Sequence, residues 1–235
     1  MALPVLATPT YELIIPSTKQ KVKFRPFLVK EEKALLIAQQ SEDDNTMLNT
    51  LKDIIASCTF NKVNADTLAL FDIEYIFTQL RAKSVGEISE LVFNCLECND
   101  PKAKININID LTKLSVTENE NHKSKIELFN DVGIQMKYPS FKSLNKLKNL
   151  NDADAIFEVV FDCIEYIYDS DNVYPASEQS REDLEKFIDN LTQDQFKKIK
   201  DFFETMPKLK HEIDFKCPVC GFNHHHTIEG LENFF

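Results

Sequence analysis

Two pairs of cysteines, each with two residues between its members, constrain this chain more than any other feature of its sequence. The first pair is Cys95 and Cys98, in the segment CLEC, and the second is Cys217 and Cys220, in the segment CPVC. A CxxC turn brings two thiolates within reach of one metal ion, and two such turns supply the four soft ligands that zinc prefers. The sequence therefore predicts one structural Zn²⁺ bound by these four cysteines.

Each cysteine pair lies between segments that alternate like β-strands. The first lies within residues 88–111, where Ile105, Ile107 and Ile109 occupy alternate positions, and the second lies within residues 211–235. We therefore expect two hairpins with a cysteine turn at each tip, together forming a zinc-ribbon-like module. The module is split, because more than a hundred residues separate its halves. A metal that joins them would close a long loop and so constrain the unfolded chain strongly.

Other uses of the four cysteines are less well supported by their context. A redox-active CxxC pair would open a helix in a βαβ unit, and neither pair is followed by a helical pattern. An iron–sulfur cluster remains an alternative, since four thiolates would also hold it. The histidine triplet that follows the second pair, His224, His225 and His226, could replace a cysteine ligand. We expect these histidines instead to alternate along the return strand and to face solvent.

The sequence offers little for catalysis. Four cysteine ligands complete a tetrahedron and leave no position for water or substrate. The chain contains no GxGxxG, GxxxxGK[ST], GxSxG or HExxH motif, and it has only four glycines. Cys58 and Cys163 lie on apolar stripes of expected helices and are interpreted as core residues. We therefore predict no catalytic residues and no cofactor-binding residues other than the metal ligands. Among the functional hypotheses considered, a zinc enzyme based on the histidine triplet is the least favoured.

The chain is expected to fold as an α+β protein, with helical bundle segments, β-hairpins and the split ribbon, because its helices and strands come in blocks. Helices are expected at residues 28–40, 47–58, 65–84, 152–169, 180–191 and 192–206, and hairpins at 11–27, 88–111, 125–141 and 211–235. The expected domain segments are 1–87, 88–141, 142–207 and 208–235, the last of which completes the zinc ribbon with 88–110.

The charge of the chain bears on its partners. The formal net charge is −11, which opposes binding to a phosphate backbone and favours solubility or a basic protein partner. A local basic segment at residues 142–150 keeps a nucleic-acid-binding zinc-ribbon regulator as the alternative function. No stretch of about 18 apolar residues predicts a membrane span, and the N-terminal segment does not read as a signal peptide. A reducing cytosol is therefore expected, where cysteine pairs are more often metal ligands than disulfides.

Several segments together resemble the baseplate hub protein family of T-even-like contractile-tailed bacteriophages, over nearly the whole chain. They are residues 11–38, residues 71–87 (FDIEYIFTQLRAKSVGE), the CLEC turn, residues 136–141 (MKYPSF) and the closing CPVCG. The resemblance implies a structural or assembly subunit of the tail baseplate hub that binds other hub or tail proteins. Its expected location is the virion tail baseplate, or the host cytoplasm during assembly.

The same resemblance supplies no catalytic residues. It draws attention to two short motifs, as contact surfaces or as elements that stabilise the fold: the RPF turn (Arg25, Pro26 and Phe27) and the LRAKS helix end (Arg81, Lys83 and Ser84).

Overall fold

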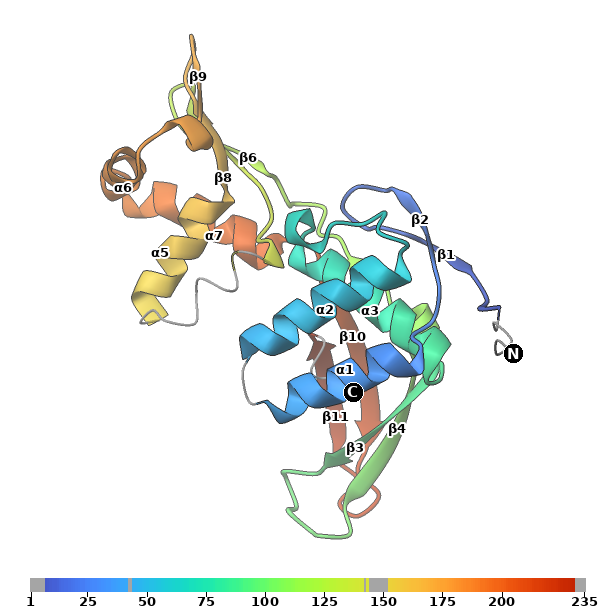
Figure 1. Ribbon diagram of the computed structural model, residues 1–235. Coiled ribbons are helices and arrows are strands. Elements are labelled where there is room, and N and C mark those ends of the chain that lie inside the picture. The colour runs from blue at the N-terminus through green and yellow to red at the C-terminus, as the bar shows by residue number, and fades with distance from the viewer. Residues whose placement is uncertain (1–6, 42–43, 142, 144–151, 231–235) are drawn as a thin grey trace, which may run out of the picture. The chain divides into compact units, whose positions relative to one another are not determined.

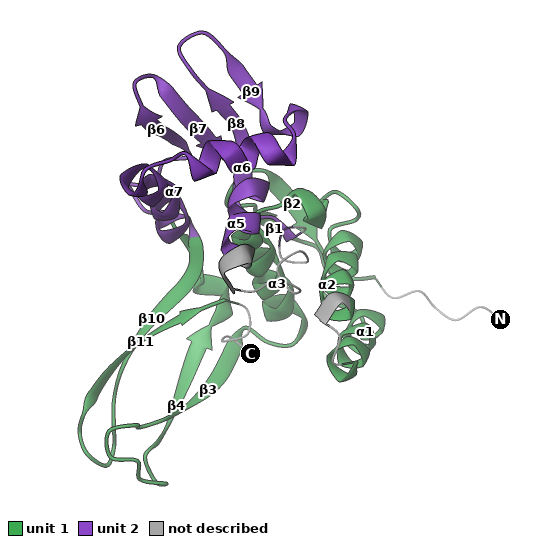
Figure 2. Cartoon of the chain, turned by 90° about the vertical axis from the view of Figure 1, so that its left-hand side faces the viewer, with its two compact units in different colours: residues 1–117, 208–235 green, residues 118–207 purple. Residues whose placement is uncertain are grey.

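The computed structural model describes residues 7–41, 44–141, 143 and 152–230 of the chain (Figure 1). Six α-helices and several small antiparallel sheets make up these residues, which confirms the α+β class. The chain divides into two compact units (Figure 2): unit 1 contains residues 1–117 and 208–235, and unit 2 contains residues 118–207. The four-segment division expected from the sequence groups residues by element type, and it stays a prediction.

The described residues of unit 1 combine three α-helices with three small sheets. The sheets pair β1 with β2, β3 with β4, and β10 with both β11 and β5. The bounds of its elements are β1 (Tyr11–Ile14), β2 (Lys21–Phe24), α1 (Val29–Gln40), α2 (Asp44–Cys58), α3 (Leu70–Ser84), β3 (Ile88–Asn94), β4 (Lys104–Asp110), β5 (Val116–Thr117), β10 (Lys208–Lys216) and β11 (Asn223–Glu229).

Unit 2 is inserted into unit 1 between two paired strands. The chain leaves unit 1 after β5 and returns at β10, and these strands are antiparallel neighbours in which Lys208 pairs with Thr117. The hydroxyl of Thr117 also donates a hydrogen bond to the carbonyl oxygen of Lys208 at 3.1 Å. The exit and the return of the chain are therefore held side by side within unit 1.

Helix α3 forms much of the core of unit 1. Its residues Ile73, Ile76, Phe77 and Leu80 are buried, as their three- and four-residue spacing predicts. Asp72, which the sequence suggests as a cap or a surface residue, is instead fully buried.

The carboxylate of Asp72 accepts hydrogen bonds from the backbone and the hydroxyl of Ser17, in the turn between β1 and β2. Burial raises the pKa of Asp72, while these bonds lower it, as expected for a desolvated carboxylate that is satisfied by donors. Asp72 therefore anchors the first hairpin to α3.

A buried ion pair ties the RPF turn to helices α1 and α2. Arg25 Nη2 lies 2.8 Å from Glu31 Oε1 and donates to Ser57 Oγ at 2.8 Å. Burial by itself would raise the pKa of Glu31, but hydrogen bonds from Arg25, from the backbone of Leu28 and from Ser57 lower it to about 2. Because a buried charge is costly without its partner, this pair fixes where the chain enters α1.

We predict that Glu31→Gln lowers the free energy of unfolding by about 3–5 kcal/mol, because it leaves the Arg25 charge buried and unpaired. The folded-state pKa of Glu31 lies below its unfolded value of 4.5. Its stabilisation is therefore present above that value and is lost as the pH falls toward about 2. Urea unfolding at a series of pH values measures both effects.

The matched control is Glu32→Gln, which removes the neighbouring exposed carboxylate. It should change stability by less than about 0.5 kcal/mol. Equal losses in the two variants, or an acid transition that is unchanged in Glu31→Gln, would contradict a stabilising buried pair.

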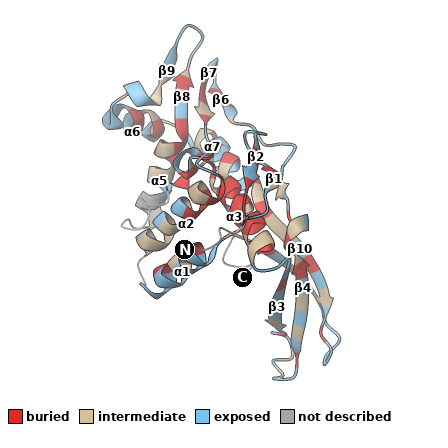
Figure 3. Ribbon diagram, turned by 45° about the vertical axis from the view of Figure 1, so that its right-hand side comes forward, coloured by how far each residue is buried: buried red, intermediate tan, exposed pale blue. Residues whose placement is uncertain are grey.

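Two long hairpins of unit 1, β3–β4 and β10–β11, lie side by side (Figures 1 and 2). Residues of both hairpins join residues of α3 and of the segment after β4 in one apolar cluster, made of Ala82, Ile109, Leu111, Leu114, Leu209, Ile213 and Ile228. The colours in Figure 3 change from buried near this cluster to intermediate and exposed along the strands that lead away from it. The hairpins are therefore anchored in the core at one end and carry their turns away from it.

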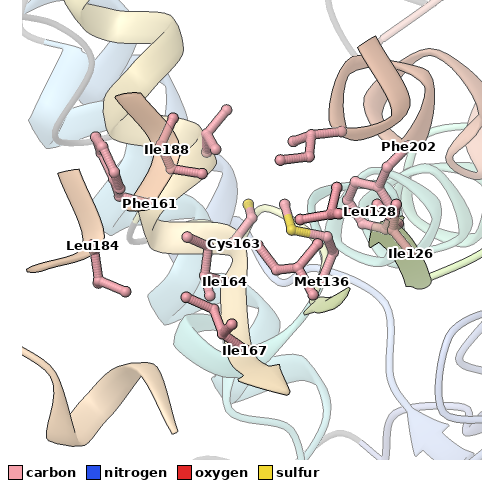
Figure 4. Packing of buried hydrophobic residues seen from close by; sticks show 13 residues of the cluster. Ile126, Leu128, Met136, Phe161, Cys163, Ile164, Ile167, Leu184, Ile188 and Phe202 are labelled. Carbon is pink, nitrogen blue, oxygen red and sulfur yellow. The ribbon is translucent and has the colours of Figure 1, made fainter. Parts of the chain in front are cut away.

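The described residues of unit 2 include a four-stranded antiparallel sheet of order β6-β7-β8-β9 and the helices α5, α6 and α7. Its core contains Ile134, Met136, Ile164 and Phe202, among other residues (Figure 4). The bounds of its elements are β6 (Lys125–Phe129), β7 (Val132–Met136), α5 (Asp152–Cys163), β8 (Ile164–Tyr168), β9 (Val173–Pro175), α6 (Arg181–Asp189) and α7 (Gln193–Thr205).

The helix predicted over residues 152–169 is wrong in its last third. Helix α5 ends at Cys163, and the following residues form β8, in which Ile167 pairs with Ile134 of β7. Ile164 and Ile167 fit a helical period, but this stretch is rich in β-branched and aromatic residues, which favour a strand beside a partner. The Tyr168 side chain also fills the space above Gly133 of β7, where an added Cβ would lie 2.2 Å from the tyrosine oxygen.

Candidate metal centre

Each cysteine pair lies in the turn of one long hairpin, as the sequence predicts. The backbone N–H of Cys95 donates to the carbonyl oxygen of Ala103 at 3.1 Å, and that of Cys217 donates to the carbonyl oxygen of Phe222 at 2.9 Å. These bonds continue the two hairpins into their turns. Gly221 has φ +75°, the left-handed conformation that glycine adopts most readily. The backbone therefore fixes the direction of both cysteine turns.

The four cysteine sulfurs converge on one point. Cys95 Sγ lies 3.7 Å from Cys220 Sγ, and Cys98 Sγ lies 3.9 Å from Cys217 Sγ, so both contacts join one hairpin to the other. All four sulfurs lie within 4.8 Å of one another. Metal–sulfur bonds of about 2.3 Å in a tetrahedron give sulfur–sulfur distances of about 3.8 Å. The donor set therefore fits one tetrahedral ion.

The same distances bear on the alternatives. A disulfide joins its sulfurs at about 2.05 Å, well below the spacing found here. In a four-iron cluster each cysteine binds a different iron atom, which spreads the sulfurs beyond the edge of a single tetrahedron. Both pairs lie in hairpin turns and not at a helix start, which does not suit a redox dithiol. A single ion with four thiolate ligands is the arrangement that the geometry favours.

The electrostatics of the cluster also favour a cation. Backbone N–H groups of Cys220 and Val219 lower the pKa of the Cys217 thiol to about 7. For Cys220 the amide of Phe222 lowers the pKa, but desolvation and the neighbouring thiols raise it to about 12. Four thiolates this close repel one another, so a bound dication is what would allow all of them to ionise together.

The prediction that all three histidines face solvent is wrong for two of them. They alternate along β11 as expected, but His224 and His226 are half-buried and stack on Phe215 of β10, at 5.0 and 5.6 Å between ring centroids. His225 is exposed, with its Nδ1 2.8 Å from Asp214 Oδ1. The inward positions are covered because the β3–β4 hairpin packs there, as the contact of His226 with Phe93 at 5.3 Å shows.

The sequence singles out His224 as a possible replacement for a cysteine ligand, but it does not predict the contact that this residue makes with Cys95. Its Nε2 lies 3.2 Å from Cys95 Sγ, on the opposite hairpin. The period of two along β11 places His224 on the same face as Ile228, a buried residue. That alternation could have indicated a buried position for His224, but only if a second hairpin were known to cover this face of β11.

Cys58 and Cys163 are buried apart from this cluster, as predicted. Burial raises the pKa of Cys58 to about 11 and that of Cys163 to about 12, so both thiols stay protonated and unreactive. Cys163 packs in the core of unit 2, and Cys58 ends helix α2 beside Arg25. Neither residue takes part in the candidate metal centre.

The RPF turn and the LRAKS helix end contact each other. The backbone N–H of Phe27 donates to Ser84 Oγ at 2.8 Å, and the Phe27 ring packs against Phe77 at 5.5 Å between centroids. Arg81 donates to the carbonyl oxygen of Gly86 at 3.4 Å. These contacts give both motifs a role in stabilising the fold.

Two further expectations concern nucleic acid and membranes. The basic segment at residues 142–150 lies outside the described residues except for Ser143. Among the described helices, none combines the length and apolar character that a membrane crossing needs.

Comparison with known proteins gives two matches of nearly full length. A family model described as "T4 bacteriophage base plate protein" matches residues 8–235, a range that contains both units and both cysteine pairs. The chain is also 26% identical over 215 residues to "Baseplate hub assembly protein gp26" of Enterobacteria phage T4, which covers 91% of this chain and 92% of that protein. No solved structure matches.

Proposed function

The chain belongs to the T4 bacteriophage base plate protein family, and on this premise we propose that it is a structural or assembly subunit of a phage tail baseplate hub. It acts by binding other hub or tail proteins. The observation that carries this proposal is the likeness to a hub assembly protein over 91% of the chain. A match of that length is far more specific than a pair of cysteine turns, which many unrelated proteins contain.

We propose that the chain is not an enzyme. The candidate metal centre has four sulfur donors, and a tetrahedron filled by them has no position for a substrate. The imidazole of His225 is paired with Asp214, and His224 is directed at a sulfur. Neither histidine is placed as the general base that a metal-bound water would need.

We further propose that Cys95, Cys98, Cys217 and Cys220 bind one structural Zn²⁺. When bound, the ion would supply four metal–thiolate bonds and no open coordination position. The support is the spacing of the sulfurs, which agrees with the edges of such a tetrahedron. A clamp between residues this far apart in sequence stabilises the fold partly by restricting the unfolded chain.

A nucleic-acid-binding regulator is the less well supported of the two candidate functions. The net charge of −11 opposes it, and membership of a baseplate protein family points to the phage virion tail. We propose that the chain is made in the host cytoplasm and exerts its effect by joining baseplate proteins.

We predict that purified, untagged chain contains about one zinc per molecule, and that Cys95→Ser or Cys217→Ser abolishes stoichiometric binding. Loss of the clamp should lower the unfolding temperature by roughly 10 °C, which corresponds to about 3 kcal/mol for a chain of this size. Elemental analysis and thermal unfolding of the same samples measure the two effects.

The matched controls are Cys58→Ser and Cys163→Ser, which alter buried cysteines outside the cluster. Both should keep the zinc and lose only packing energy. Metal-free wild-type protein, or loss of zinc in all four variants alike, would reject the proposed ligand set.

We predict that full-length chain captured from phage-infected cells retains other baseplate hub or tail proteins, identified by mass spectrometry. An unrelated acidic protein of similar size and net charge serves as the control for charge-driven capture. Recovery of a monomer with no tail protein, combined with salt-sensitive binding to duplex DNA, would replace this proposal with the regulator reading.

A further inference from the structure

The contact between His224 and Cys95 joins the two halves of the candidate metal centre, and it involves one proposed ligand, Cys95, and one residue outside the ligand set, His224. Cys95 belongs to the turn that follows β3, and the residue is 2% exposed. His224 belongs to β11, in the other hairpin, and its Nε2 lies 3.2 Å from Cys95 Sγ. This nitrogen-to-sulfur distance lies within the range of a hydrogen bond to sulfur.

The imidazole is held in place by aromatic neighbours. Its ring stacks on Phe215 with centroids 5.0 Å apart and planes 20° apart, and Phe222 meets it edge-on at 4.9 Å. Such packing limits the rotation of the side chain and keeps one ring nitrogen directed at the sulfur. The geometry is therefore built by the fold and does not depend on an exposed side chain.

We propose that the His224 Nε2–H group donates a hydrogen bond to the Cys95 thiolate and so positions and stabilises this ligand of the metal centre. The inference rests on the zinc site of the proposed function. A metal-bound thiolate carries no proton, so the imidazole must be the donor, and its neutral tautomer must carry the hydrogen on Nε2. His224 is thus a positioning residue that acts on the ion through Cys95.

The arrangement of the donors separates this role from direct ligation. The group of side chains whose ligand atoms all lie within 4.8 Å of one another consists of the four cysteines and does not contain His224. Four sulfurs already complete the coordination that zinc prefers. The imidazole faces one of these sulfurs from outside the tetrahedron.

Hydrogen bonds to the sulfurs stabilise the negative charge that remains on the cluster when the ion is bound. Four thiolates and one dication leave two negative charges in a cluster in which Cys95 and Cys217 are buried. The backbone N–H of Val219 lies 3.4 Å from Cys217 Sγ. The backbone amide of Asp100 donates a hydrogen bond to Cys98, and that of Phe222 donates one to Cys220. His224 provides the equivalent donor for Cys95, from the opposite hairpin.

Removal of this donor should weaken the site without removing a ligand. Loss of a group that supports a metal ligand typically lowers metal affinity by 10–100-fold. The Cys95 sulfur would also become more electron-rich, which moves a sulfur-to-metal charge-transfer band to lower energy. The second effect reports on the sulfur itself, and a loss of packing alone would not produce it.

The test uses the full-length chain loaded with Co²⁺, and it compares the charge-transfer band and the rate of metal transfer to a chelator. His224→Phe keeps a ring between Phe215 and Phe222 but removes the donor, so we expect a band at lower energy and about tenfold faster transfer. His224→Gln offers an amide N–H at a similar reach and should restore both values toward those of the wild type. The control His226→Phe changes a histidine on the same face that stacks on Phe215 and Phe93, and it should behave as wild type.

A second measurement needs no variant and so does not depend on folding of the substituted chain. In metal-loaded wild-type protein labelled with ¹⁵N, the His224 Nε2 proton should be visible by NMR and exchange slowly with water. A rapidly exchanging or absent Nε2 proton would overturn the proposal, as would a His224→Phe protein with an unchanged band and transfer rate. Cobalt spectra that indicate a lost ligand in both His224 variants would also overturn it, because His224 would then bind the metal directly. Failure of the wild-type chain to bind any metal would instead reject the zinc site itself.

Discussion

The convergence of four cysteine sulfurs is the constraint on which the two long hairpins of unit 1 depend. At one end the hairpins share an apolar cluster with α3, and at their tips the sulfurs of Cys95 and Cys220 lie 3.7 Å apart. Between these ends the rings of Phe93, Phe215 and His226 pack across the pair. The two hairpins belong to separate sheets, so side chains supply the contacts that fix one against the other. A tetrahedral ion would set their alignment, because its geometry tolerates little displacement of any one ligand.

A second level of constraint comes from buried polar groups near the N-terminus. The buried carboxylates of Asp72 and Glu31 accept hydrogen bonds from Ser17 and Arg25 respectively, and both contacts tie the β1–β2 region to helices. Apolar packing alone allows small shifts between elements, whereas an unpaired buried charge costs several kcal/mol. These contacts therefore specify a single position for the first hairpin.

An element could be predicted from the sequence where its signal is local. The cysteine turns and the buried face of α3 were predictable because a short period and a fixed spacing define them. Strand β8 was missed because Ile164 and Ile167 fit a helical period, and the β-branched and aromatic residues of this stretch favour a strand only where β7 is present to pair with it. The contact of His224 with Cys95 was not predicted for a related reason, since the face of β11 that is covered depends on a hairpin more than a hundred residues earlier. Contacts between distant segments decided each of these cases.

A structural role in a baseplate calls for defined surfaces that other proteins can bind, and each compact unit supplies surfaces of its own. The pairing of β5 with β10 gives unit 1 an additional property, because it holds the start and the end of the 118–207 segment next to each other. A segment attached in this way can change in length or be replaced by another domain without altering how the strands of unit 1 are connected. A change in the length of residues 118–207 therefore leaves the path of the chain through both cysteine turns unaltered.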